Sequence, residues 1–188
     1  VKDVKIVNID IQEQSDIVKA GGGKAWPKVD AFASWDHHIA LYESKGLAKI
    51  LKSGTALGVV AMSQKFVDAN PDPAVGFLAA FKLACYYYAN KQDQADRWFA
   101  DATQGKFELE ILREVAAIEP NMRGKQLNEM AIDLSPAHIA ILQSAADFAY
   151  SQKLIQSPIS IAERTLTGLS AKQKELTDEQ VSKLEALP

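Results

Sequence analysis

The sequence predicts an α/β protein, in which a mainly parallel β-sheet is flanked by helices and is followed by a helical C-terminal half. Three observations predict this fold. In the first third of the chain, short apolar runs rich in β-branched residues alternate with helix-like segments. Prolines beside Asn70 then interrupt this rhythm. Beyond them, apolar residues recur at the spacing of amphipathic helices.

Four short apolar runs are predicted as buried strands, because each is bounded by polar or glycine residues. These runs are residues 4–9, 29–33, 47–51 and 58–63. Helices are predicted over residues 12–20 and 39–44. The first of them ends at three glycines, residues 21–23. A phosphate-binding loop needs a strand before its glycines and a helix after them, so helix termination is the favoured interpretation.

Helices dominate the rest of the chain. Pro73 suits the first turn of a long helix. The predicted helices cover residues 73–90, 93–103, 107–118 and 136–152. Cys85 shares an apolar stripe of the first of these, so we expect a buried core thiol. Near the C-terminus, Thr177 and Gln180 form a capping box that predicts one more helix.

Composition is typical of a globular protein and excludes several classes of partner. The 188 residues carry a net charge of -3, which gives no general attraction to nucleic acid or anionic lipid. A single cysteine excludes an internal disulfide and a zinc site of clustered thiolates, and no motif predicts a cofactor. The sequence shows no signal-peptide run and no stretch near the ~20 apolar residues of a membrane span. We therefore expect a soluble chain.

The predicted ligand site follows two of the predicted strands, residues 29–33 and 58–63. In an open α/β sheet, ligands bind at the carboxyl ends of strands. The candidates combine a stacking ring with several hydrogen-bonding groups, and they are Ser34, Trp35, Asp36, His37, Met62 and Ser63. We expect these side chains to line one side of a cleft.

Several candidates also have a structural explanation. Trp35 could be a core residue at the end of a strand, and Asp36 could cap the helix that follows it. His37 and His38 are adjacent, so their side chains point apart on a helix or strand and make a poor metal site. We expect no catalytic residue and no metal ligand in this loop.

Three segments resemble the solute-binding proteins of ABC importers, in the group that binds aliphatic sulfonates, taurine, nitrate and thiamine-precursor pyrimidines. Residues 29–36, Val-Asp-Ala-Phe-Ala-Ser-Trp-Asp, resemble the strand and loop in which a "VDA" is followed by "WD". Residues 66–71, Phe-Val-Asp-Ala-Asn-Pro, resemble the start of the long helix of that group. Residues 145–158 resemble the end of a late helix. His37 stands where the group commonly has proline.

This resemblance implies a fold like that of type II periplasmic binding proteins, whose two lobes close on a ligand about a hinge. Residues 1–55 would be an α/β segment of the second lobe. Residues 56–165 would return through the hinge into a first-lobe strand and helices, and residues 166–188 would form a helical tail. The N-terminal half of the family would be absent, so a missing first-lobe segment or a second copy would cover the apolar faces.

The resemblance also implies a function. The chain would be a periplasmic or cell-surface component that binds a small polar ligand and works with the membrane subunits of an ABC transporter. A sulfonate or other oxyanion is the usual ligand of the family. The loop after residue 33 instead carries a carboxylate and no arginine, which favours an amine, a zwitterion or a neutral ring.

The alternative function is an enzyme on the same scaffold, similar to a sulfinate desulfinase or a pyrimidine synthase. Desulfinases use a cysteine nucleophile and the synthases a cysteine-rich motif, and these segments are unmatched here. Cys85 lies on an apolar helix stripe with no adjacent base, so it does not replace them. The binding function is therefore preferred.

Overall fold

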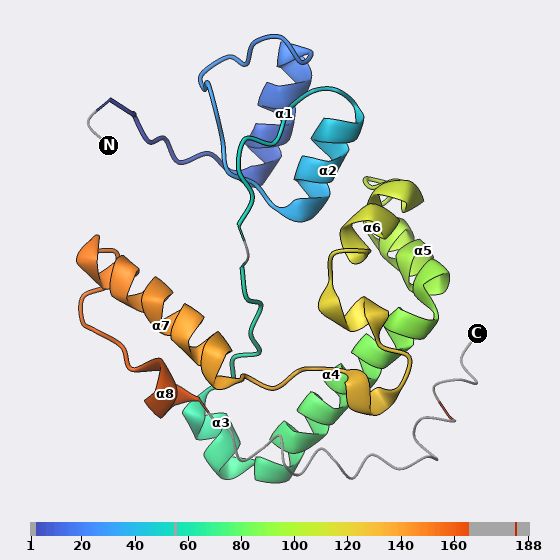
Figure 1. Cartoon of the computed structure of the whole chain (residues 1–188), viewed down its shortest axis with the longest axis vertical. Helices are drawn as coiled ribbons and strands as arrows, with labels where there is room; N and C mark the ends of the chain where they lie inside the picture. The colour runs from blue at the N-terminus through green and yellow to red at the C-terminus, as the bar shows by residue number, and fades with distance from the viewer. Residues whose placement is uncertain (1–2, 55, 166–182, 184–188) are drawn as a thin grey trace. The chain divides into compact units, whose positions relative to one another are not determined.

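The computed structural model describes residues 3–54, 56–165 and 183, and this part of the chain is built from helices joined by extended segments (Figure 1). The helices, in chain order, are α1 (Ile11–Gly21), α2 (Asp36–Ser44), α3 (Gln64–Ala69), α4 (Pro71–Asn90), α5 (Gln92–Ala102), α6 (Leu109–Ala116), the 3-10 helices η1 (Pro120–Arg123) and η2 (Leu127–Glu129), α7 (Pro136–Ser151) and α8 (Ile161–Arg164).

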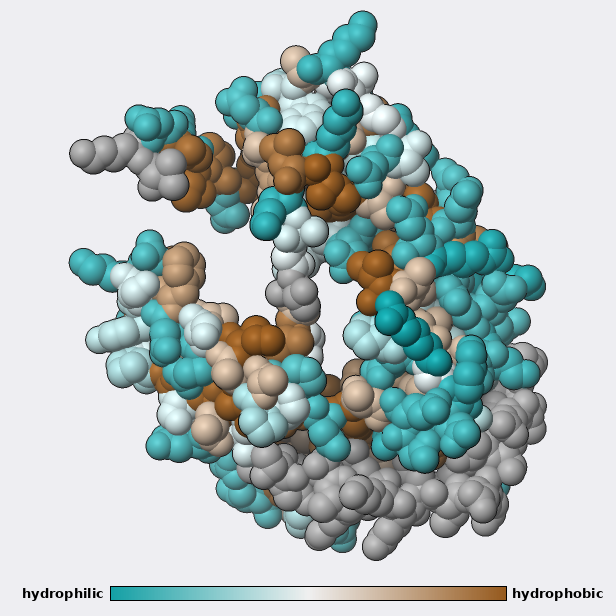
Figure 2. All heavy atoms as spheres, viewed as in Figure 1, coloured by the Kyte–Doolittle hydropathy of each residue, from teal (hydrophilic) through white to brown (hydrophobic). Residues whose placement is uncertain are grey.

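The predicted α/β fold class is wrong, because the described residues contain no β-strand and therefore no parallel sheet. The four apolar runs predicted as strands are extended or turn segments instead. Many of their side chains are exposed, including Ile6 at 92% and Leu51 at 86%, and Figure 2 shows apolar side chains of the N-terminal segment at the surface. A β-branched run becomes a strand only where a neighbouring strand pairs with it, and sequence periodicity does not report that partner.

The helices predicted within residues 3–165 are confirmed, with ends that differ from the prediction by a few residues. The glycines after α1 end the helix as expected: Gly22 has a φ of 57°, and its N–H donates to the Lys19 carbonyl at 3.2 Å. Ser135 caps α7, since its Oγ accepts the His138 N–H at 3.2 Å and its own N–H donates to His138 Nδ1 at 3.3 Å. Local capping and periodicity therefore fix most helices.

No described helix is both long enough and apolar enough to cross a membrane. The helix expected near Thr177, like the whole predicted tail 166–188 except Lys183, lies outside the described residues. The assignment of residues 1–55 and 56–165 to lobes stays a prediction.

The chain forms two compact units. Unit 1 comprises Val1–Gly54 and Gln92–Pro120, and unit 2 comprises Thr55–Lys91 and Asn121–Pro188. In unit 1, α6 packs against both α2 and α5. The apolar core of unit 1 joins residues from the two parts of the chain, and it consists of Val18, Ala40, Leu41, Tyr42, Phe107, Ile111 and Leu112.

Tyr42 of this core contacts several segments of unit 1. Its side chain is 1% exposed, and its hydroxyl shares a buried hydrogen bond of 2.7 Å with Ser15 Oγ of α1. The ring of Phe32 meets the Tyr42 ring edge-on, with centroids 5.9 Å apart. The Tyr42 carbonyl accepts the Leu47 N–H at 2.8 Å. Tyr42 of α2 thus contacts α1, the segment before α2 and the segment after α2.

Unit 2 has a smaller core. Tyr86 and Ala89 of α4 pack with Met130, and Cys85 is packed against this cluster. Cys85 is half-buried, so the expectation of a fully buried thiol was too strong. The side chain of Gln143 in α7 accepts the Ile161 N–H at 2.9 Å, which connects α7 to α8.

Removal of the Tyr42 hydroxyl should destabilise unit 1. Tyr42→Phe leaves Ser15 Oγ buried without a partner, so we expect the free energy of unfolding to fall by about 1–2 kcal/mol. Urea unfolding followed by tryptophan fluorescence measures this change, because Trp26, Trp35 and Trp98 all belong to unit 1. Ser15→Ala combined with Tyr42→Phe should cost less than the sum of the single changes. Additive effects would mean that the two hydroxyls do not interact.

Candidate functional site

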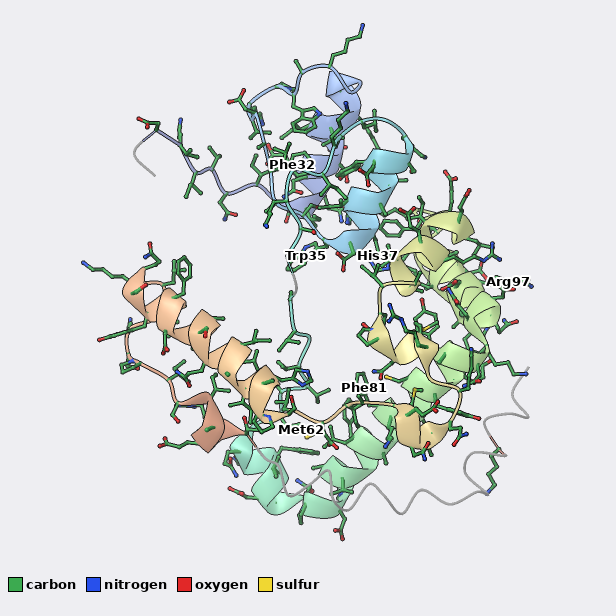
Figure 3. The ribbon with its side chains drawn as sticks, viewed as in Figure 1. Phe32, Trp35, His37, Met62, Phe81 and Arg97 are labelled. Carbon is green, nitrogen blue, oxygen red and sulfur yellow. The ribbon has the colours of Figure 1, made fainter. Side chains whose placement is uncertain are left out.

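The candidate ligand residues of unit 1 lie at the start of α2 (Figure 3). Trp35 occupies the N-cap position, and its carbonyl accepts the N–H groups of His38 and Ile39, each at 3.0 Å. The side chain of Trp35 is 68% exposed, so it is a surface residue rather than a core tryptophan. Asp36 is the first residue of α2 rather than its cap, and its carboxylate complements the helix dipole from the first turn.

A pocket of about 500 Å³ lies in unit 1, where the chain enters α1 and α2. This volume is within the range of small-molecule sites. Two predicted residues, Ser34 and Trp35, are among the residues that line the pocket, which are Asn8, Ile9, Asp10, Ile11, Gln14, Ala33, Ser34 and Trp35. The pocket walls therefore come from two segments of the chain, residues 8–14, which include the first turn of α1, and residues 33–35, which precede α2.

A single side chain joins these two walls. Gln14 of α1 donates from Nε2 to the Ala33 carbonyl at 3.1 Å. The other end of this amide, Gln14 Oε1, is buried and has no hydrogen-bond partner among the described residues, and the same is true of Ser34 Oγ. Buried polar atoms are almost always paired, so two unpaired oxygens on neighbouring pocket residues are uncommon. Two lining residues of the pocket thus each hold a buried polar atom without a partner in the described part of the chain.

Asp10 supplies the charge of the pocket. Its Oδ1 accepts the Gln12 N–H at 2.8 Å and thereby caps α1. The residue itself is exposed, and it is one of the lining residues of the pocket. The amino end of a helix attracts anions in general, but the Asp10 side chain already occupies this position.

His37 and His38 lie in an aromatic cluster of unit 1 rather than on the pocket lining. His37 stacks on Phe99 with ring centroids 5.6 Å apart, and His38 meets Phe107 edge-on at 5.3 Å. His38 is buried and its Nε2 has no hydrogen-bond partner in the described part of the chain. Burial lowers the pKa of His38, and the nearby positive charges of Lys106 and His37 lower it further.

The other two candidates belong to unit 2. Met62 is half-buried, and Ser63 caps α3 by accepting the Phe66 N–H at 3.2 Å. A ligand contact for Met62 and Ser63 stays a prediction. No cluster of His, Cys, Asp and Glu suited to a metal ion occurs within residues 3–54 and 56–165.

The sequence reasoning missed the α1 side of the pocket, namely Asn8, Asp10 and Gln14. The signal for Asp10 was present, because this residue follows the run 4–9 in the same way that Ser34 follows the run 29–33. Applying the same argument to both runs would have found Asp10. Gln14 lies one helical turn later, and only the folded chain brings it to Ala33.

One comparison relates the chain to a known protein. The chain is 26% identical over 165 residues to a protein of Bacillus subtilis (strain 168) named "Putative aliphatic sulfonates-binding protein", a match that covers 85% of the chain and 45% of the relative. The chain thus spans less than half the length of that relative. No family model matches the chain, and no solved structure matches it. The similarity suggests a solute-binding role and does not identify the ligand.

Unit 1 should lose stability in mild acid because of His38. The folded state holds the pKa of His38 below its usual 6.5, so the unfolded chain binds more protons as the pH falls through this value. Stability should therefore be full above about pH 6.5 and decline as the pH falls toward the lowered pKa.

Urea unfolding followed by tryptophan fluorescence at several pH values tests this expectation. His38→Phe keeps a ring against Phe107 and removes the titrating group, so the pH dependence should flatten. His138→Gln alters a histidine of unit 2 and serves as the control. If His38→Phe kept the full decline in mild acid, another group would be responsible.

Proposed function

We propose that this chain is the ligand-binding part of an extracytoplasmic solute-binding component of an ABC importer. The observation that carries the proposal is the similarity to a protein named as binding aliphatic sulfonates, at 26% identity over 85% of the chain. The pocket before α1 and α2 supports the proposal, because Ser34 and Trp35 of the loop predicted from the sequence are among its lining residues. Its partners would be a small polar molecule and the membrane subunits of the transporter.

In this proposal, Trp35 provides the apolar face against which the ligand packs. An indole offers a large contact area with little loss of side-chain entropy, and 68% of Trp35 is exposed before a ligand arrives. Ser34 and Gln14 would supply hydrogen bonds at the pocket wall. Asp36 and His37 would lie at the margin of the site, next to Trp35 in the chain.

A binding role is proposed in preference to an enzyme on the same scaffold. The relative is named as a binding protein, and this is the more specific indication. Incubation with alkanesulfonates and alkanesulfinates, followed by mass spectrometry of the small molecules, separates the two functions. A binding protein returns each compound unchanged, whereas detection of sulfite or another product would establish an enzyme.

Trp35→Ala should weaken ligand binding without unfolding the protein. Loss of the indole contact should cost about 1–3 kcal/mol of binding free energy, because a large apolar contact is removed. Calorimetry with a series of short alkanesulfonates and aminoalkanesulfonates measures the change. Trp98→Ala removes another exposed tryptophan of unit 1 that does not line the pocket, and it should bind as the parent protein does. Equal affinity of the parent and Trp35→Ala would place the ligand elsewhere.

A further inference from the structure

The pocket before α1 and α2 accepts hydrogen bonds and carries negative charge. Among the described residues, its lining contains the carboxylate of Asp10 and no lysine, arginine or histidine. Proteins bind sulfonates and other oxyanions with positively charged side chains or free backbone N–H groups. A pocket whose only charge is a carboxylate is poorly suited to the acid end of a ligand.

The nearby lysines add no positive charge to the residues that line the pocket. Lys106 donates to Gln12 Oε1 at 3.0 Å, and Lys28 forms an ion pair of 2.6 Å with Glu13. Both lysines are thus engaged by the first turn of α1, and neither is a lining residue. The amino end of α1 is covered by Asp10, whose Oδ1 accepts the Gln12 N–H.

The available acceptors match an ammonium group. Asp10 uses Oδ1 for the helix cap, which leaves Oδ2 for a ligand. Gln14 Oε1 and Ser34 Oγ belong to lining residues and are buried without a hydrogen-bond partner among the described residues. A primary ammonium group has three N–H donors and no acceptor, so it fits a site of this composition.

Trp35 adds a surface that attracts cations. Its exposed indole lies on the lining, and the face of an aromatic ring attracts a positive charge within about 6 Å of the ring centre. An alkyl chain attached to the ammonium group could pack on the same ring. The carboxylate and the indole therefore favour one chemical class of ligand.

We propose that this pocket binds the ammonium end of a small organic amine, with Asp10 as the counter-ion and Trp35 as the stacking face. This inference rests on the proposed solute-binding function and narrows its ligand class. A ligand that also carries an acid group would direct that group away from the pocket.

Three matched compounds test the inference by calorimetry on the full chain: propylamine, propane-1-sulfonate and 3-aminopropane-1-sulfonate. The inference expects the amine-bearing compounds to bind at least about tenfold more tightly than propane-1-sulfonate. Equal affinity for the two sulfonates would overturn the ammonium inference and leave the binding function in place. If none of the three compounds bound, the proposed function would also be rejected for these ligand classes.

Asp10→Asn removes the charge and keeps the helix cap, because asparagine caps helices about as well as aspartate. This variant should lose about 10- to 100-fold in affinity for the amine-bearing compound that binds best. Asp16→Asn removes the same charge from an exposed position of α1 that does not line the pocket, and it should leave that affinity unchanged. An equal loss in both variants, or in neither, would contradict a direct role for Asp10.

Discussion

The buried hydrogen bond between Ser15 and Tyr42 is the constraint on which the pocket of unit 1 depends. It joins α1 to α2, and these helices carry the two walls of the pocket. Gln14 directly precedes Ser15 in the chain, and its side-chain amide donates to the Ala33 carbonyl. The hydrogen bond from Gln14 to Ala33 and the buried hydrogen bond from Ser15 to Tyr42 therefore come from the same turn of α1. A change that loosens Tyr42 should therefore disturb the site as well as the core.

This constraint is itself supported by residues far along the chain. Phe107 and Leu112 belong to the same core cluster as Tyr42, although residues 55–91, which belong to unit 2, lie between them and Tyr42 in the chain. Phe107 also meets the ring of His38 edge-on. Unit 1 is thus assembled from two distant segments, and its core contains residues of both. The pocket is lined by segments of the first 35 residues, but the core that supports it also contains residues from the segment 107–112.

The sequence predicted most helices because their signals are local. Caps such as Ser135 and stop signals such as Gly22 act within one helical turn, so they can be read without the fold. The predicted strands were wrong for the opposite reason, since a strand is defined by a partner elsewhere in the chain. Ile6 and Leu51 have the side chains of buried strands and are nevertheless exposed. For a similar reason the sequence pointed to Ser34 and Trp35, which follow an apolar run, and not to Gln14, which reaches the pocket through the packing of α1.

The similarity to the sulfonate-binding relative and the lining of the pocket suggest different chemical groups on the ligand. The relative is named for aliphatic sulfonates, but the match covers 45% of its length, so the groups that hold its ligand need not have counterparts in this chain. Among the described residues, the lining of the pocket contains Asp10 and no other charged side chain. The two observations are compatible if the ligand carries both an acid and an amine, because opposite ends of one molecule require opposite surroundings. In that arrangement, Asp10 and Trp35 recognise the amine, and the acid group requires donors outside this pocket.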